Sequence, residues 1–276
     1  MYLQFNLIIY LMKNKSFLLL FFFLFLCQVS FAQQTILNDS NLPIMVISTD
    51  IDPDTNAPTD IPDEPKVLGS MQLIYRPDGS RNYLTDSTNE SFLNYKGRIG
   101  IELRGSSSQA LDKKPYGFTT LLQDGDSNNN VSLLGMPSEN DWVLNSLAYD
   151  PSMIRDYLSY TLASNMGNYA PRVQYIEVIV NGDYKGVYFL TEKVKRDSDR
   201  VNLKKIADDD NDFPDITGGY IIKADKTTGG DEIAWTMPNY GGWDTNFLHH
   251  YPKTEDITSA QANYIETVFY DLEAQT

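Results

Sequence analysis

The feature that most constrains the fold is a pair of long apolar segments joined by a two-residue turn. Val173–Val180 and Asp183–Thr191 are rich in Val, Ile, Tyr and Phe, and Asn181-Gly182 lies between them. That dipeptide favours the tight turn of an antiparallel hairpin, because both residues tolerate a positive φ. Most positions in both strands are apolar, so we predict that the hairpin lies in the middle of its sheet.

Other segments are also typical of strands, because they are short, rich in β-branched or aromatic residues and bounded by turn residues. Two stretches lack this pattern. The proline- and aspartate-rich Asp50–Pro65 is predicted to be a loop, and Thr227–Gly242 is predicted to be irregular. The predicted strands are Ile44–Ser48, Val67–Tyr75, Arg98–Arg104, Lys114–Leu122, Asp141–Leu144 and Gly219–Ala224.

Two segments carry helix signals. Asp150 is a natural N-cap with Pro151 at the first helical position, and the helix is predicted to end at Gly167. Thr258 and Gln261 form a capping box ahead of a second helix. Many strands, one long middle helix and a late helix predict an α+β fold with a mostly antiparallel sheet. The apolar face expected for the first helix consists of Ile154, Tyr157, Leu158, Thr161 and Leu162.

The N-terminal segment has the pattern of a secretory signal peptide. A basic region with Lys13 and Lys15 precedes the apolar run Phe17–Leu26, and small residues stand before a cleavage point near Ala32. The apolar run is short for a membrane span, and Cys27 lacks the small preceding residues of a lipid-anchor site. We therefore predict an exported protein, either secreted or held in the periplasm or at the cell surface. No stable membrane span is expected after signal removal.

Cysteine content and charge narrow the possible functions. Cys27 is the single cysteine and lies in the signal peptide, so the mature chain has neither disulfides nor thiolate metal sites. The net charge is −15, and loss of the two signal lysines brings it to about −17, which argues against a nucleic-acid partner. We divide the chain into the signal peptide 1–32, a β-rich N-terminal segment 33–95 and a main domain 96–276.

Several acidic or aromatic residues allow more than one interpretation. Three loops carry alternating oxygen ligands but lack the glycine and closing glutamate of an EF-hand, so we interpret them as solvated turns, with Ca²⁺ binding as the alternative. The adjacent His249 and His250 are interpreted as structural or exposed, and no metal ligand is assigned. Trp142 is expected in the core, whereas Trp235 and Trp243 are left open between core packing and sugar stacking. The loops are Asp50–Asn56, Asp124–Asn130 and Asp208–Asp212.

The stretch Ile99–Phe118 is a candidate phosphate site. A strand ends at Gly105, and Ser106, Ser107 and Ser108 then offer backbone N–H groups and hydroxyls that suit an anion. The alternation of the next predicted strand favours Lys114 over Lys113 as the lysine that points inward. The alternative interpretation is a surface hairpin with solvated lysines.

An inward lysine needs either a carboxylate partner or a bound anion. Glu102, Asp150 and Asp156 are the candidate partners of Lys114, and the sequence does not choose among them.

Five separated motifs follow one another between Ile101 and Asp225: IELRGSSSQ with the nearby KKPYGF, LLGMPSENDWVL, DPSMIRDYLSYTLA, VIVNGDYKGVYFLTEKVKRDSDRV and GGYIIKAD. In this order they resemble the spore coat protein H (CotH) kinase family, and they cover most of the mature chain. The resemblance implies a divergent protein-kinase-like fold that binds ATP with Mg²⁺ and phosphorylates Ser or Thr of secreted or surface proteins.

The resemblance also implies roles for individual residues. Arg104 with Ser106, Ser107 and Ser108 takes the position of a phosphate-covering loop. Lys114, or alternatively Lys113, takes the role of the strand lysine that contacts the α- and β-phosphates. Glu192 falls where the chain passes the adenine.

The catalytic residues are left unassigned. In the family, the aspartates that orient the substrate hydroxyl and hold Mg²⁺ lie downstream of the helix that begins near Thr258, and the sequence stops at Thr276. We therefore expect an incomplete, inactive portion of a kinase unless the sequence is a fragment of a longer protein. The alternative is a non-catalytic surface or coat-assembly module that uses the same fold for binding.

Overall fold

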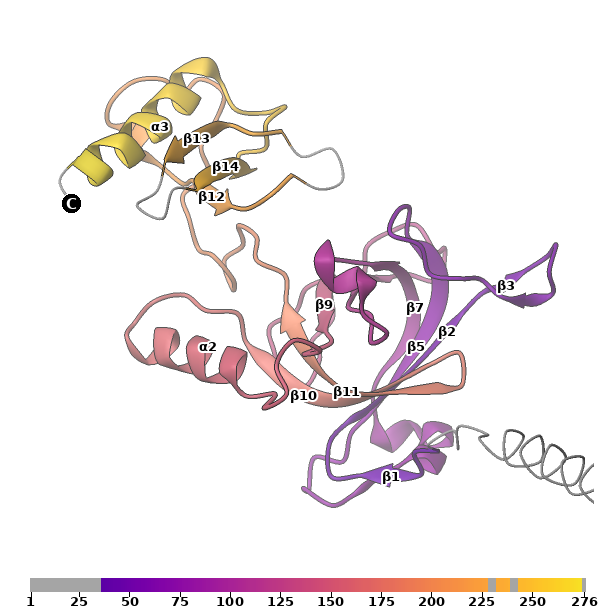
Figure 1. Ribbon diagram of the computed structural model, residues 1–276. Coiled ribbons are helices and arrows are strands. Elements are labelled where there is room, and N and C mark those ends of the chain that lie inside the picture. The colour runs from indigo at the N-terminus through magenta and orange to yellow at the C-terminus, as the bar shows by residue number, and fades with distance from the viewer. Residues whose placement is uncertain (1–35, 228–231, 239–242, 275–276) are drawn as a thin grey trace, which may run out of the picture. The chain divides into compact units, whose positions relative to one another are not determined.

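The computed structural model describes residues 36–227, 232–238 and 243–274 (Figure 1). The signal peptide predicted for residues 1–32 lies outside this range. In the described part, no helix is both long enough and apolar enough to cross a membrane.

Seven strands form a closed barrel (Figure 1). Neighbouring strands pair antiparallel, except that β10 and β2 pair in parallel and thereby close the barrel. In order around the barrel the strands are β10 (Val173–Val180), β11 (Asp183–Glu192), β9 (Asp141–Asn145), β8 (Tyr116–Leu121), β7 (Leu93–Leu103), β5 (Val67–Ile74) and β2 (Ile44–Thr49).

The barrel encloses one apolar core. Side chains alternate along each strand, so every second residue points inward. Ile101 of β7, Phe118 of β8 and Trp142 of β9 are almost fully buried in this core, which confirms the prediction for Trp142. Ile47 of β2 and Val178 of β10 join the same cluster from the closing strands.

The hairpin expected from the Asn-Gly turn is confirmed. β10 has the predicted bounds, β11 extends one residue further, to Glu192, and the turn residues Asn181 and Gly182 have φ values of 50° and 79°. β10 also pairs with β2, and β11 also pairs with β9, so both strands have neighbours on both sides.

The boundary predicted between residues 95 and 96 lies inside β7. β2 and β5 come from the segment before this boundary, and the other barrel strands follow it. The barrel therefore joins strands from both sides of the boundary into one closed sheet.

Three predicted segments differ from the structure. β8 begins at Tyr116 rather than Lys114, because the preceding residues up to Pro115 lie outside the strand ladder. The predicted loop Asp50–Pro65 contains a short antiparallel pair, β3 (Ile51–Asp52) with β4 (Ala57–Pro58). The stretch predicted to be irregular contains β13 (Trp235–Pro238), and its remaining residues lie partly outside the described range.

The remaining short elements lie between the longer strands. β1 (Asp39–Ser40) pairs antiparallel with β6 (Asn82–Tyr83). Short 3-10 helices are found at Leu84–Thr88, Glu90–Phe92, Ser107–Ala110 and Asp215–Thr217.

The middle helix is shorter and more exposed than predicted. α2 (Arg155–Asn165) begins five residues after Asp150, and Pro151 lies in the turn before it. Met153 has a φ of 55°, outside the helical region, so the helix starts only after it. The apolar face is also exposed: Leu158 and Leu162 retain 55% and 62% of their accessible surface.

Asp150 still caps the start of α2, although from a position outside the helix. Its carboxylate accepts hydrogen bonds from the backbone N–H groups of Ile154 and Arg155 at 3.0 and 2.9 Å. The Ser152 hydroxyl and this backbone N–H bonding lower the pKa of Asp150 to about 2. Because the folded-state pKa lies below the ordinary value, the cap stabilises the helix start above about pH 4 and is lost as the pH falls towards 2.

The expected loss of the Asp150 cap at low pH can be checked by NMR. The amide resonances of Ile154 and Arg155 should move together as the pH falls below about 4, and Asp150→Ala should remove that titration. Asp112→Ala removes an exposed carboxylate that does not cap the helix, and it should leave the titration unchanged. Identical titration curves in the wild type and Asp150→Ala would contradict the capping role.

The C-terminal part of the chain forms a second small sheet that packs on the last helix. β12 (Ile221–Ala224), β14 (Asp244–Tyr251) and β13 lie in that order, and α3 (Ser259–Ala274) follows. The capping box is confirmed, because Thr258 N–H donates to the Gln261 side chain and Gln261 N–H donates to Thr258 Oγ1. With 16 residues against 11 in α2, α3 is the longer of the two described α-helices.

The predicted α+β class with a mostly antiparallel sheet is confirmed. A closed barrel was not predicted, and the kinase-like fold stays a prediction.

Candidate functional site

A row of polar side chains crosses the outside of the barrel on three adjacent strands. Glu102 of β7, Thr119 of β8 and Asp141 of β9 alternate with Ile101, Phe118 and Trp142, which point into the core. Thr119 and Asp141 are direct partners across the strands, so their side chains share one face. Glu102 and Asp141 of this row, together with neighbouring residues, line a small hollow.

The hollow has a volume of about 50 Å³. Gly117 widens it, because a Cβ atom at that position would lie 3.3 Å from Glu102 Oε1. The lining residues are Lys66, Glu102, Arg104, Gly117, Phe118, Asp141, Trp142, Val143 and Lys193. We call this the barrel-face hollow.

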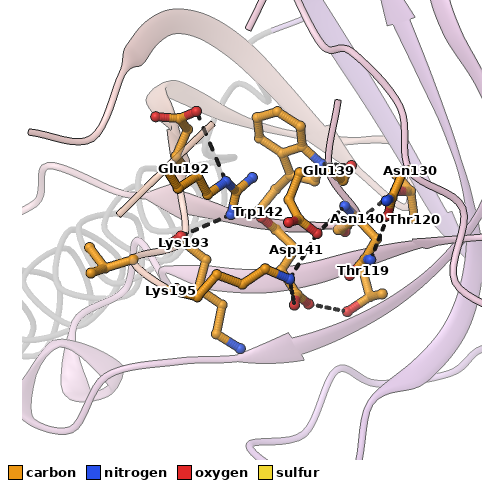
Figure 2. Close-up of polar contacts among 12 residues, drawn as sticks. Thr119, Thr120, Asn130, Glu139, Asn140, Asp141, Trp142, Glu192, Lys193 and Lys195 are labelled. Atoms are coloured by element: carbon orange, nitrogen blue, oxygen red, sulfur yellow. Dashed lines mark hydrogen bonds and ion pairs between the residues drawn. The ribbon is translucent and has the colours of Figure 1, made fainter. Parts of the chain in front are cut away.

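Hydrogen bonds and ion pairs connect the charges around the hollow. Lys66 Nζ donates to Thr119 Oγ1 at 2.8 Å and lies 3.7 Å from Glu102 Oε1. Thr119 Oγ1 donates in turn to Asp141 Oδ1 at 2.9 Å. Lys195 then binds both Asp141, at 3.2 Å, and Glu139, at 2.8 Å (Figure 2). These contacts fix the carboxylates in place.

Lys193 differs from the other two lysines. Its ammonium makes no hydrogen bond or close ion pair within the described residues, although Asp141, Lys66, Glu102 and Lys195 all influence it electrostatically. Burial lowers the pKa of Lys193, and the neighbouring Asp141 offsets only part of that effect. The Lys193 side chain is exposed, and an ammonium without a bonded partner is a donor available to a bound anion.

The two carboxylates respond to the same environment in opposite ways. Burial raises the pKa of Glu102, although Lys66 opposes the change. Burial alone would also raise the pKa of Asp141, but Lys193, Thr119 and Lys195 together hold it below its usual value. Asp141 therefore stays ionised and favours the charged form of Lys193.

A second donor on this side of the barrel lacks a partner. Thr191 of β11 lies directly opposite Val143 of β9, which lines the hollow. The Thr191 hydroxyl is buried and has no hydrogen-bond partner in the described part of the chain. Buried hydroxyls are normally satisfied, so an unpaired one two residues before Lys193 fits a site for an oxyanion.

The structure places Lys113 and Lys114 away from the barrel-face hollow. Lys113 Nζ donates to the carbonyl oxygen of Val187 and lies 4.7 Å from the ring centroid of Tyr188, and burial lowers its pKa. Lys114 Nζ donates to the carbonyl oxygen of Gln109 at 2.6 Å. The parity argument that favoured Lys114 fails because both lysines precede β8, so the desolvated lysine is Lys113.

None of the three proposed carboxylates pairs with Lys114. Glu102 binds Lys66, and Asp150 caps α2 and pairs with Arg155. Asp156 accepts a hydrogen bond from the Asn145 amide at 3.1 Å. In the described residues the Lys114 ammonium is satisfied by a backbone carbonyl instead.

The loop predicted to cover phosphates lies next to the hollow. Gly105 has a φ of 85°, which turns the chain sharply after β7. Arg104 lines the hollow from the end of that strand and is exposed. Ser106 and Ser107 are exposed and Ser108 is half-buried, and none of the three lines the hollow.

Glu192 is buried and engaged in an ion pair. Its carboxylate accepts hydrogen bonds from the backbone N–H and the guanidinium of Arg172 at 2.9 to 3.1 Å. A second guanidinium, that of Arg200, lies 4.0 Å away. The side chain of Glu192 therefore holds barrel segments together at the end of β11.

The charged residues that line the hollow were largely missed from the sequence. Lys66 precedes β5 without any motif, and Asp141 lies at the start of a predicted strand and in the motif LLGMPSENDWVL but was assigned no role. Lys193 and Lys195 follow the predicted hairpin, and their alternation places both on one side of the extended chain. That alternation, and the motif VIVNGDYKGVYFLTEKVKRDSDRV that contains both lysines, were the usable signals.

A larger hollow of about 410 Å³ lies between α2, the loop Leu134–Pro137 and the segment Ala170–Gln174. Its walls are mostly Tyr, Pro, Met and small polar residues. The one charged residue in its lining, Arg172, is already bound to Glu192. The barrel-face hollow is therefore the better candidate for an anion site.

The acidic loops are accounted for as turns. Asp52 and Asp124 accept hydrogen bonds from backbone N–H groups two and three residues later, and Asp210 accepts one from Ala207 N–H. In the described part of the chain, no three His, Cys, Asp or Glu side chains are grouped so as to hold a metal ion. Ca²⁺ binding by these loops gains no support.

The aromatic and histidine side chains of the C-terminal sheet are mainly structural. Trp235 is buried and stacks on Phe247, with ring centroids 5.2 Å apart, and it also contacts His249. Trp243 retains 78% of its surface. Core packing is therefore the role of Trp235, and Trp243 is exposed.

A family model described as "CotH kinase protein" matches residues 101–276. The chain belongs to the CotH kinase family. The match confirms the resemblance inferred from the five motifs and indicates a kinase-like function. It begins within β7, so Lys66 and the strands β2 and β5 of this CotH-family chain lie before it. A search of curated proteins found no match.

Proposed function

We propose that this CotH-family chain binds ATP with the phosphates at the barrel-face hollow. The observation that carries the proposal is the ammonium of Lys193 at the hollow, unpaired within the described residues, two residues after the buried and unpaired hydroxyl of Thr191. Phosphoryl transfer depends mainly on positioning and charge neutralisation, which lysines in a partly dehydrated hollow provide. Lys193 would contact the phosphates directly, and Lys66 would add a second positive charge.

The loop from Arg104 to Ser108 fits next to this site. Arg104 already lines the hollow, and the serines follow it on a turn whose backbone N–H groups could approach phosphate oxygens. Lys113 or Lys114 would reach the nucleotide only after giving up its present carbonyl partner. For the adenine, the segment at Glu192 would contribute backbone groups, because the carboxylate is bound to Arg172.

The described residues fit phosphate better than they fit Mg²⁺. Asp141 and Glu102 are the carboxylates at the hollow, and each is already paired with a lysine. When bound, Mg²⁺ would neutralise phosphate charge, and Asp141 is the residue placed to share in holding it. The chain's own contribution is to bind and orient the phosphates.

The proposal extends to an exported kinase. The signal-peptide pattern of residues 1–32 supports export, and the family match supports phosphate transfer to a protein. The proposed substrates are Ser or Thr residues of secreted or surface proteins.

Lys193→Met should weaken ATP binding at least tenfold, because the change removes a lysine ammonium at the hollow that has no bonded partner among the described residues. Isothermal titration of the purified chain with ATP, with and without Mg²⁺, measures the effect. Lys96→Met is the matched control, since it removes an exposed lysine on β7 and should leave the affinity unchanged. Equal affinities for the wild type and Lys193→Met would refute the placement of the phosphates.

The same titration tests whether the phosphates bind at the barrel-face hollow or at Lys114, the lysine predicted from the sequence. Lys114→Ala should bind ATP as the wild type does, because the Lys114 ammonium donates to the backbone carbonyl of Gln109 and does not line the hollow. A loss confined to Lys114→Ala would instead favour the earlier assignment. A wild-type chain that binds neither ATP nor MgATP would remove the nucleotide proposal altogether.

A further inference from the structure

One buried arginine binds the backbone of two residues that line the barrel-face hollow. Arg200 Nη1 donates to the carbonyl oxygen of Asp141 at 2.9 Å and to that of Lys193 at 2.8 Å. Asp141 begins β9, whereas Lys193 follows the end of β11. A single guanidinium therefore joins the two segments that carry the opposite charges of the site.

Arg200 is held rigidly in this position. Its side chain has no solvent exposure, and its guanidinium carbon lies 5.1 Å from the ring centroid of Trp142. Glu192, also fully buried, lies 4.0 Å from its Nε atom. A planar, always charged side chain packed in this way has little freedom to move.

The burial of Arg200 is costly, which argues that it does more than fill space. In the described part of the chain, its Nε and Nη2 atoms have no hydrogen-bond partner. Unsatisfied buried donors normally destabilise a fold, and an apolar residue of similar size would avoid that cost. An apolar residue could not bind the two carbonyl oxygens, however.

The segment after β11 depends on such anchors. Lys193 and Lys195 lie on a loop that doubles back, with a bridge between Arg196 and Val201. Arg200 is the anchor on the buried side, and the Arg172 guanidinium binds the carbonyl oxygen of Asp199 on the other side. Without the inner anchor, nothing else among the described contacts of Lys193 fixes its side chain over the hollow.

We propose that Arg200 is a positioning residue that fixes the Lys193 ammonium opposite Asp141 in a geometry ready for phosphate. The proposal rests on the proposed function only for the identity of the anion. The positioning itself is a property of the free protein, so it can be tested without nucleotide.

The test measures the reactivity of one lysine. Limited acylation across a pH series, followed by peptide mass spectrometry, gives the pH profile of Lys193 in the free chain. Arg200→Met should shift this profile to higher pH, towards that of an ordinary lysine, because the released side chain becomes solvated. ATP affinity should fall at least tenfold in the same variant.

Two further variants distinguish a loss of Lys193 positioning from a loss of folding stability. Arg200→Lys retains a cation that can reach one carbonyl, so its profile and affinity should lie between those of the wild type and Arg200→Met. If Arg200→Met does not fold, Arg200→Lys decides the question. Arg81→Met removes an exposed arginine paired with Asp39 and should change neither measurement.

The outcomes distinguish the two proposals. A shifted Lys193 profile in a chain that binds no ATP would support the positioning role and refute the nucleotide. An unchanged Lys193 profile in a folded Arg200 variant would overturn the positioning role, whatever the ATP affinity.

Discussion

A chain in which Ile47 is replaced by Asp should lose the cooperative unfolding transition of the barrel. Ile47 is fully buried on β2, and its backbone partners are Met71 of β5 and Val180 of β10. An unpaired carboxylate at this position would cost several kcal/mol, a large part of the about 5–15 kcal/mol that stabilises a typical domain. Urea unfolding followed by the fluorescence of the buried Trp142 would measure the loss.

The adjacent residue provides a matched control. Ser48 lies on the same strand with its side chain exposed, so Ser48→Asp should change the unfolding free energy by about 0.5 kcal/mol or less.

A chain that begins at residue 96 retains the family match but lacks β2 and β5, and it should behave like Ile47→Asp. Cooperative unfolding of that shortened chain would show that the barrel does not need its first two strands.

Glu192→Gln should lower the free energy of unfolding by about 3 kcal/mol. The carboxylate is fully buried between Arg172 and Arg200, and removing its charge leaves the buried Arg200 guanidinium without its nearest anion. Removing one partner of a buried ion pair leaves an uncompensated charge, which is the costly step. Urea unfolding of the two proteins at the same pH checks the prediction.

A surface pair serves as the comparison for Glu192. Glu255 lies 3.8 Å from Lys253, and both side chains are mostly exposed, so Glu255→Gln should change stability by about 0.5 kcal/mol or less. If Glu192→Gln instead retains full stability and loses ATP affinity, the side chain contacts the nucleotide. That result would restore the direct adenine role implied by the family resemblance.

Local signals in the sequence located much of the fold. The Asn181-Gly182 turn gave the bounds of β10 and β11, because a two-residue hairpin turn fixes the register of both strands. The capping box at Thr258 and Gln261 gave the start of α3. In each case the decisive contacts lie within a few residues of one another.

Features that depend on distant contacts could not be predicted. α2 starts later than predicted, because Asp150 caps it across a turn with a positive φ at Met153. The apolar periodicity of the sequence does not reveal such a turn. The lysines of the candidate site come from before β5 and after β11, and only the lateral order of the strands brings them together. Arg200 lies within the motif VIVNGDYKGVYFLTEKVKRDSDRV, but its hydrogen bonds to the backbone carbonyls of Asp141 and Lys193, 59 and 7 residues away, are not evident from the sequence.

The parallel pairing of β10 with β2 has a consequence for the order of folding. It joins Ile44 to Glu177 and Ile47 to Val180, so the two partners are separated by 133 residues, the difference between 177 and 44. While the chain is synthesised, β2 can pair with β5 early but must keep its other edge open until β10 has emerged. Closing so long a loop is slow, and an open edge is a template for pairing with other chains. The last step of folding is therefore also the step at which this protein is most prone to aggregate.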